Sequence, residues 1–178
     1  MKSLMDLRRV RALGALMSTT SLLIACGGGG GSDDPPATSV TVSGKAVDGP
    51  LQGVTACYDL NDNYACDSGE PTSAATGADG AFTISGIAIA EGGKHAVLVD
   101  VPPTAIDADT GAAVGTPFIM VAPATSASGN HSVFVTPLTT LVVLQQGSTA
   151  QTLADATAFV QSQLGLAVSP LADFTASG

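Results

Sequence analysis

The stretch Ser39-Val-Thr-Val-Ser-Gly-Lys-Ala-Val47, followed by the turn residues Asp48-Gly49-Pro50, decides the fold class. Apolar and polar side chains alternate along it and β-branched residues are frequent, which is typical of a β-strand with one buried face. Similar short segments recur downstream between turns and predict further strands at 53–58, 81–85, 95–101, 117–121 and 132–135. Several short strands in succession predict a β-sandwich over residues 39–136.

The period of the hydrophobic pattern changes after Val135. Thr136-Pro137 has the form of a helix N-cap followed by proline at the first helical position, and Gly147 is a plausible stop for that helix. Ser148 to Gln151 fits a capping box for a second helix, which Gly165 would end. We therefore expect a short helical region at 137–178, in which Ser169-Pro170 begins a further helix. The alternative to a complete helical region is an incomplete one.

The N-terminus carries the signals of an exported protein. Basic residues lie at Lys2 and at three arginines up to Arg11, an apolar run extends to Ile24, and a small residue precedes Cys26. These are the parts of a secretory signal peptide, and the apolar run is too short for a permanent transmembrane helix. We therefore expect residues 1–25 to be a signal peptide and the glycine- and proline-rich residues 26–38 to be a flexible tether.

Leu23-Ile-Ala-Cys26 resembles the lipobox of bacterial lipoproteins. The resemblance implies that Cys26 becomes the first residue of the mature protein and carries diacylglycerol and a further acyl chain such as palmitate, which together anchor a protein stably. Gly27 follows the cysteine, where an Asp would resemble an inner-membrane retention signal, so the resemblance favours the outer membrane. The alternative is an ordinary secreted protein whose cleavage point falls near a cysteine.

The composition limits the classes of partner. The chain has 6 basic and 15 acidic residues, and four of the basic residues and one acid lie in the expected signal peptide. The rest of the chain has 2 basic and 14 acidic residues, a net charge of −12. Such a surface repels nucleic acid and anionic headgroups and attracts cations. Aromatic residues make up only 4% of the chain, which argues against a stacking surface for sugars.

The segment from Asp59 to Glu70 is the strongest candidate site. Oxygen-bearing side chains stand at positions 1, 3, 5, 9 and 12 of this segment, which is the spacing of a calcium loop, and position 7 adds a backbone carbonyl. Calcium prefers six to eight oxygen ligands, so a loop of this length can wrap around the ion. The predicted ligands are Asp59, Asn61, Asn63, Ala65, Asp67 and Glu70.

Two residues of this loop are not ligands in the pattern. Tyr64 occupies the sixth position, which is normally glycine because the chain turns sharply there. Asp62 points outward in such a loop. The alternative is a polar hairpin loop without an ion, since Asn and Asp are common in turns for reasons unrelated to metals.

Cys57 and Cys66 remain as a pair if Cys26 is lipidated. Exported compartments are oxidising, so two remaining cysteines are expected to form a disulfide there. Zinc binding has the wrong spacing and neither histidine is close in sequence. A redox-active pair usually has the Cys-x-x-Cys spacing, which this pair lacks.

The residues from Ser39 to Val101 resemble a carboxypeptidase regulatory-like or serine-aspartate-repeat B-type domain. The motifs that carry the resemblance are Val42-Ser-Gly-Lys-Ala-Val-Asp-Gly-Pro50, the acidic loop, and Asp79-Gly-Ala-Phe-Thr-Ile84. The resemblance implies a transthyretin-like β-sandwich that is non-catalytic and serves as a stalk, spacer or accessory module. Some B-type loops in that family bind calcium.

No catalytic motif accompanies these features. The sequence has no Gly-x-Ser-x-Gly elbow and no phosphate-binding glycine-rich loop, and His95 and His131 each begin an expected strand. We therefore expect a non-enzymatic surface lipoprotein with a structural or interaction role and an envelope protein or a glycan as partner. The alternatives are a carbohydrate-binding module and the N-terminal part of a larger envelope enzyme or receptor.

Overall fold

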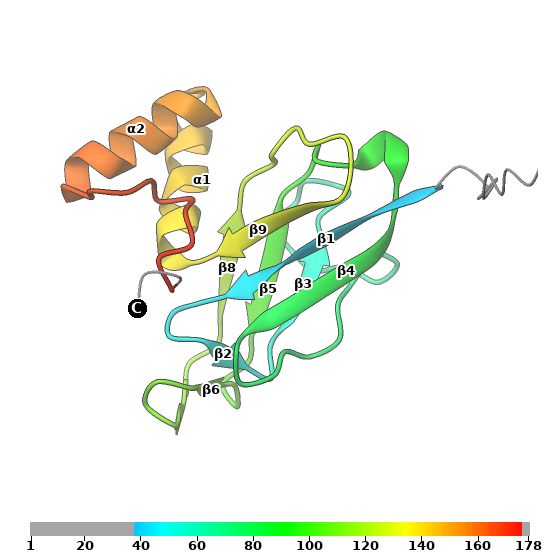
Figure 1. Ribbon diagram of the computed structural model, residues 1–178, viewed down its shortest axis with the longest axis vertical. Coiled ribbons are helices and arrows are strands. Elements are labelled where there is room, and N and C mark those ends of the chain that lie inside the picture. The colour runs from blue at the N-terminus through cyan, green and yellow to red at the C-terminus, as the bar shows by residue number, and fades with distance from the viewer. Residues whose placement is uncertain (1–37, 176–178) are drawn as a thin grey trace, which may run out of the picture. The chain divides into compact units, whose positions relative to one another are not determined.

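A computed structural model describes residues 38–175, so the expected signal peptide, Cys26 and nearly all of the tether lie outside the described residues. The described part is mainly β, as the sequence predicts, with three small sheets followed by two helices (Figure 1). All described residues belong to one compact unit, 35–178.

The first sheet has the strand order β4-β1-β9. Its central strand is β1 (Ser39–Ala46), which pairs antiparallel with β4 (Ala81–Ala88) and parallel with β9 (His131–Val135). Gly44 of β1 is closely surrounded by β9 and by Phe82 of β4. A Cβ atom there would stand 2.1 Å from the carbonyl oxygen of Val133 and 2.6 Å from the ring of Phe82, so the position admits no larger residue without movement.

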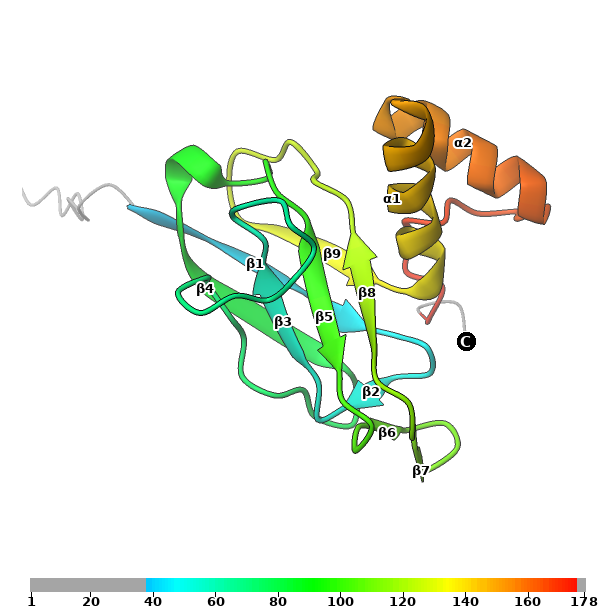
Figure 2. The same ribbon diagram turned by 180° about the vertical axis from the view of Figure 1, so that it is seen from behind.

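The second sheet has the order β3-β5-β8 and is antiparallel throughout (Figure 2). Its strands are β3 (Thr55–Tyr58), β5 (Val97–Val101) and β8 (Phe118–Ala122). The outer edge of β3 is covered by the chain that follows the acidic loop: Ser73 N–H donates to the Ala56 carbonyl at 2.8 Å, and Thr76 N–H to the Val54 carbonyl at 2.8 Å.

Four short elements were not expected from the sequence. The third sheet joins β2 (Leu51–Gln52), β6 (Ile106–Asp107) and β7 (Ala112–Ala113), and η1 (Ile89–Glu91) is a single 3₁₀ turn before β5. Strands of two residues are too short to show an alternating pattern, so only the turn between β6 and β7 is visible in the sequence.

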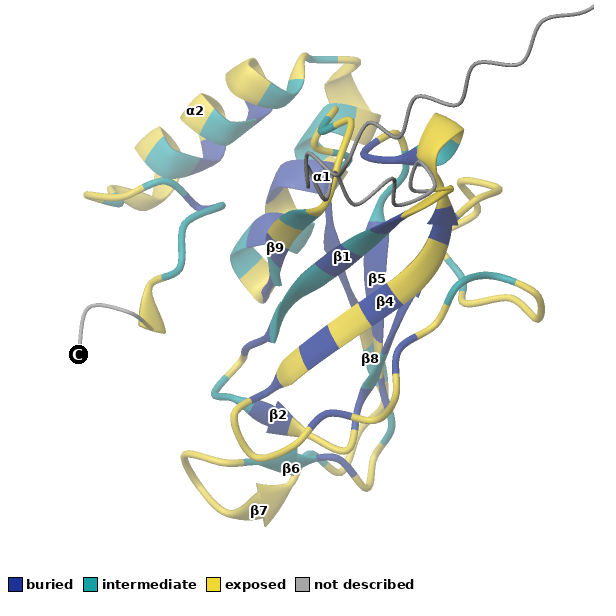
Figure 3. Cartoon of the chain, turned by 45° about the vertical axis from the view of Figure 1, so that its right-hand side comes forward, coloured by how far each residue is buried: buried dark blue, intermediate teal, exposed yellow. Residues whose placement is uncertain are grey.

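The first and second sheets contribute most of the side chains of one hydrophobic core. Exposed and buried residues alternate in β4 from Ala81 to Ser85, as period-2 geometry requires of a strand with one solvent-exposed face (Figure 3). The alternation is interrupted at Gly86, where the pairing with β1 is irregular. The core members are mostly β-branched and aliphatic, with Tyr58 the largest fully buried side chain. They include Val42, Ala46, Ile84, Ile87, Val97, Val99, Val101, Met120 and Val135.

The first helix, α1 (Pro137–Thr149), begins as predicted at the N-cap Thr136. Thr136 and Thr139 form a reciprocal capping box, in which each side chain accepts the other residue's backbone N–H. The prediction that this helix stops at Gly147 is wrong, because α1 continues two residues further and ends before Ala150, which adopts a left-handed conformation. A Cβ at Gly147 would meet nothing within 4 Å, so this glycine marks neither a turn nor a close contact.

The second helix, α2 (Leu153–Leu164), ends at Gly165 as expected. Its N-cap is Thr152, whose hydroxyl accepts the backbone N–H of Asp155, so the predicted capping box from Ser148 to Gln151 is wrong. Ser169-Pro170 begins no helix in the described residues, which reach 175.

The helices are attached to the outer face of the second sheet through α1. Val143 packs against Cys57, Leu98 and Val121, which point away from the main core. Val121 on β8 donates its N–H to the Thr140 hydroxyl at 2.9 Å and accepts from the Thr139 hydroxyl at 2.7 Å. The start of α1 therefore covers part of the β8 edge, which would otherwise be open to pairing.

Candidate metal-binding loop

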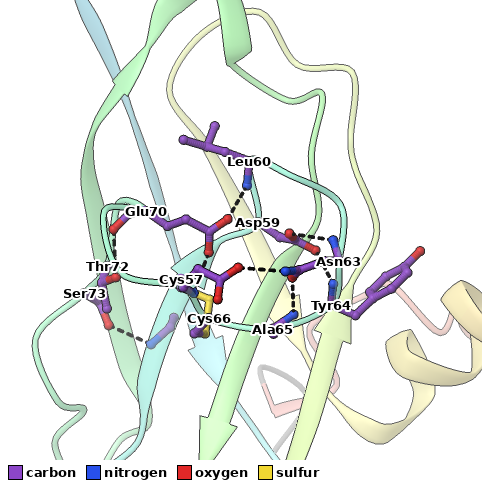
Figure 4. The surroundings of a disulfide bond; sticks show 12 residues. Cys57, Asp59, Leu60, Asn63, Tyr64, Ala65, Cys66, Glu70, Thr72 and Ser73 are labelled. Atoms are coloured by element: carbon purple, nitrogen blue, oxygen red, sulfur yellow. Dashed lines mark hydrogen bonds between the residues drawn. A yellow bond between two sulfur atoms is a disulfide. The ribbon is translucent and has the colours of Figure 1, made fainter.

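The Asp59–Glu70 loop follows β3 directly and is closed by a disulfide (Figure 4). Cys57 and Cys66 are bonded, with their Cα atoms 5.7 Å apart, which confirms the predicted pair. Cys57 is fully buried in β3, whereas Cys66 is exposed in the loop. Four of the six predicted ligand positions lie between these cysteines, so the bond restrains that part of the loop before any ion binds.

Asp59, at the first loop position, is fully buried. Its Oδ1 accepts the backbone N–H of Asn63 at 3.1 Å and its Oδ2 accepts that of Tyr64 at 2.9 Å. Its own N–H donates to the Ala96 carbonyl, just before β5, at 3.1 Å. The carboxylate therefore pulls the fifth and sixth positions of the loop back over the first.

The asparagines at positions 3 and 5 each form an Asx turn. Asn61 Oδ1 accepts the N–H of Asn63 at 3.1 Å, and Asn63 Oδ1 accepts the N–H of half-buried Ala65 at 2.8 Å. Their Nδ2 groups both donate to Oδ2 of Asp67, at 2.8 Å and 2.7 Å. Hydrogen bonds from Asn61 and Asn63 hold the pKa of Asp67 below its ordinary value, because they stabilise the ionised carboxylate.

Glu70, at the twelfth position, closes the loop from its far end. Oε1 accepts the N–H of Leu60 at 2.8 Å, and Oε2 accepts the N–H of Asp67 at 3.0 Å. One carboxylate thus ties the second position of the loop to the ninth. Hydrogen bonds within the loop therefore link the predicted side-chain ligands to one another.

Tyr64 adopts the backbone conformation that the pattern reserves for glycine. Its φ is +60°, and that of Asp62 is +56°, so two non-glycine residues of the loop are left-handed. This conformation costs a non-glycine residue about 1–2 kcal/mol. At its sixth position the loop therefore differs from the calcium-loop pattern in residue type, whereas its backbone has the left-handed conformation for which the pattern uses glycine. The tyrosine ring is 52% exposed and lies beside Val143 and Leu144 of α1.

The three carboxylates among the predicted ligands have no cationic partner among the described side chains. Within residues 38–175, no ion pair involves Asp59, Asp67 or Glu70. The same residues contain no cluster of three or more His, Cys, Asp or Glu side chains arranged to hold a metal ion. Three of the six predicted ligands would use an amide or backbone oxygen. The other three are carboxylates, and each of them accepts hydrogen bonds from N–H groups of the loop. The donor set is all oxygen, which suits a hard cation such as calcium.

The sequence did not single out the contacts of His95. This residue lies just before β5, with Nδ1 2.9 Å from Oδ1 of Asp62 and Nε2 3.0 Å from Oε2 of Glu91. The spacing of four residues between Glu91 and His95 was the one local feature from which their contact could have been predicted. The contact with Asp62 joins residues 33 apart in sequence, so it could not be predicted without the three-dimensional structure.

Comparison of the chain with protein-family models, with curated proteins and with solved structures finds no match. Neither α1 nor α2, the two helices of the described part, has the length and hydrophobicity needed to cross a bilayer. The predicted lipidation site, Cys26, lies outside the described residues.

Proposed function

We propose that this chain is a non-catalytic lipoprotein of the bacterial cell envelope, anchored in the outer membrane through Cys26. Its folded part would be a transthyretin-like β-sandwich of the carboxypeptidase regulatory-like or serine-aspartate-repeat B type. The sheets β4-β1-β9 and β3-β5-β8, which share one core, support this assignment. Its role would be structural or interaction-based, with calcium stabilising the Asp59–Glu70 loop.

The observation that carries the calcium proposal is the hydrogen-bond pattern of the loop. The first position accepts N–H groups from the fifth and sixth, positions 3 and 5 form Asx turns, and the twelfth returns to the second. Without these bonds, turn composition alone would explain the acidic residues. These turns support the proposal, because a twelve-residue calcium loop also folds its later positions back over its first.

The ion would hold the carboxylates of Asp59, Asp67 and Glu70 and the oxygens of Asn61, Asn63 and Ala65. It would supply the positive charge that the described neighbourhood of these carboxylates lacks. At present the amide groups of Asn61 and Asn63 donate to Asp67. Calcium would replace those two donors, so binding competes with hydrogen bonds that the loop already makes.

An interaction role is supported by the apolar side chains on the side of α1. Ile119, Leu141 and Leu144 are 43%, 43% and 62% exposed, and they line hollows along α1 and β8. The sequence of α1 contains no charged residue, although the chain as a whole is strongly acidic. A neutral apolar face on an acidic protein is typical of a protein–protein contact.

Thermal unfolding of the purified chain with and without calcium tests the metal proposal. A weak extracellular-type site has a Kd on the order of 10⁻⁴–10⁻³ M, so 5 mM calcium would stabilise the fold by about 1–2 kcal/mol. This corresponds to a rise in Tm of roughly 3–10 °C.

The decisive variants are Glu70→Gln, which removes one ligand charge, and Asp109→Asn, which removes an exposed charge outside the loop. We expect the first to abolish the calcium-dependent rise in Tm and the second to retain it. An equal rise in both variants would mean that calcium only screens the net charge. The absence of any rise in the unmodified chain would end the metal proposal.

A further inference from the structure

His95 lies between two carboxylates that come from different parts of the chain. Its Nδ1 is 2.9 Å from Asp62 in the acidic loop, and its Nε2 is 3.0 Å from Glu91 in η1. An ionised carboxylate only accepts hydrogen bonds, so both ring nitrogens must donate for both contacts to exist. The geometry therefore corresponds to the imidazolium, the protonated form of the ring.

The ring is fixed from the side of the core by Tyr58. The two rings meet edge to face, with centroids 5.7 Å apart and an interplanar angle of 81°. The Tyr58 hydroxyl donates to the Glu91 carbonyl at 2.6 Å and accepts the N–H of His95 at 3.3 Å. Only 13% of the His95 side chain is exposed, against 67% for Asp62 and 40% for Glu91. The histidine is therefore the rigid member of the trio, and Asp62 is the one most free to move into water.

Asp62 is itself held in an unfavourable backbone conformation, with φ at +56°. It is not among the predicted calcium ligands. Its bond to His95 connects the tip of the loop to the segment before β5. We propose that His95 is a proton-operated latch, which holds the Asp59–Glu70 loop closed when the ring is charged and releases it at Asp62 when the ring loses its proton.

The charged groups around His95 set the sign of the effect. Burial lowers the pKa of His95, but the hydrogen bonds and negative charges of Asp62 and Glu91 outweigh it, so the net pKa is raised above 6.5. Lys94 lies 4.0 Å from the other oxygen of Glu91 and opposes the ring charge weakly. The remaining neighbours are Tyr58, whose hydroxyl pKa burial raises, and the segment of α1 near Lys94, which carries no charge.

A folded-state pKa above the unfolded value means that the latch contributes fully below about pH 6.5. Its contribution is lost as the pH rises through the folded-state pKa of His95. A neutral imidazole keeps one donor, and Tyr58 and η1 keep Glu91 in place, so the bond to Asp62 is the one that breaks. The loop should therefore open on the alkaline side.

Amide hydrogen exchange of the full chain, purified without a histidine tag and in a chelator to remove calcium, tests the latch. The reporters are the N–H groups of Asn63, Tyr64 and Ala65, which bond within the loop. After correction for the intrinsic effect of pH, we expect their protection to fall about two- to fivefold between pH 6 and pH 9, the factor that a partly exposed charged pair supplies. Use of the metal-free chain separates this result from the fate of the calcium proposal.

Two variants and one control complete the design. His95→Gln and Asp62→Asn should both give low protection that no longer depends on pH, and Asp62→Asn should also lower the pKa of His95 followed by NMR of its ring. His131→Gln, at the other histidine of the chain, should behave like the unmodified protein. Protection that is independent of pH in the unmodified chain, or a pH dependence that survives in Asp62→Asn, would overturn the proposal.

Discussion

Removal of the Cys57–Cys66 bond should destabilise the fold by an amount that follows from the length of the loop it closes. The cysteines are 9 residues apart, so the bond closes a loop of about ten residues. The chain-entropy relation gives about 2.7 kcal/mol at 25 °C for such a loop. That is a large share of the 5–15 kcal/mol that typically stabilises a domain.

Cys66→Ser is the better perturbation, because Cys66 is exposed and Cys57 is not. Replacement of Cys66 removes the cross-link and leaves the thiol of Cys57 packed against Leu98, Val121 and Val143. The double variant Cys57→Ala/Cys66→Ala also removes one buried sulfur atom. Burial of a group of that size contributes about 1 kcal/mol, so the double variant should lose roughly 3.5 kcal/mol.

Urea unfolding followed by far-ultraviolet circular dichroism measures both losses. We expect Cys66→Ser to lose about 2–3 kcal/mol and roughly 10 °C in Tm, and to be insensitive to added reductant. The unmodified chain in reductant should match it. Mass spectrometry should first confirm that the oxidised, unmodified chain contains the bond. If the free energy of unfolding of Cys66→Ser then lies within about 0.5 kcal/mol of that of the oxidised chain, the argument that the cross-link restrains the unfolded state is refuted.

Three further predictions follow from single contacts. Thr139→Val removes a buried hydroxyl that accepts the Thr136 N–H and donates to the Val121 carbonyl. Urea unfolding should therefore show a loss of about 1–3 kcal/mol in the free energy of unfolding. The control is Thr157→Val at a partly buried residue whose hydroxyl bonds within its own helix, and it should cost under about 0.5 kcal/mol. The lowered pKa of Asp67 means that its carboxylate stabilises the loop at pH values above 3.8 and that this contribution is lost as the pH falls through the folded-state pKa; an NMR titration of the Asp67 carboxyl carbon should give a value below 3.8, which Asn61→Ala should raise. Cys26→Ser should move the protein from the membrane fraction to the soluble fraction with a lower mass, and an unchanged distribution would contradict the lipid anchor.

The strands that alternate over five or more residues could be predicted from the sequence. The pattern at Ser39–Val47 gave β1 to within one residue, because one face of that strand is buried and the other is not. β2, β6 and β7 are two residues long, which is too short for an alternating pattern, and β2 also depends on pairing with the distant β6. Two of the three errors in the helical region have one cause: Gly147 and Ser148 were interpreted as a stop and a cap, but both are tolerated in the exposed last turn of α1.

In the candidate site, too, some features could be predicted from the sequence and others depend on the fold. The cysteine pair and the order of loop ligands depend on residue type and spacing, which the sequence displays. The left-handed backbone at Tyr64 contradicts the usual preference for glycine, and it is maintained by the bond from its N–H to buried Asp59. The contact of His95 with Asp62 depends on how β5 is placed beside the loop, which no local signal encodes.

The central claim is that the Asp59–Glu70 loop binds calcium, and an NMR titration of backbone amide shifts with calcium tests it most directly. The account predicts saturable changes that are largest at Asn61, Asn63, Asp67 and Glu70, with a Kd on the order of 10⁻⁴–10⁻³ M, and only small changes with magnesium at the same ionic strength. Shifts spread evenly over the acidic surface, or no shifts in the loop at 10 mM calcium, would contradict it.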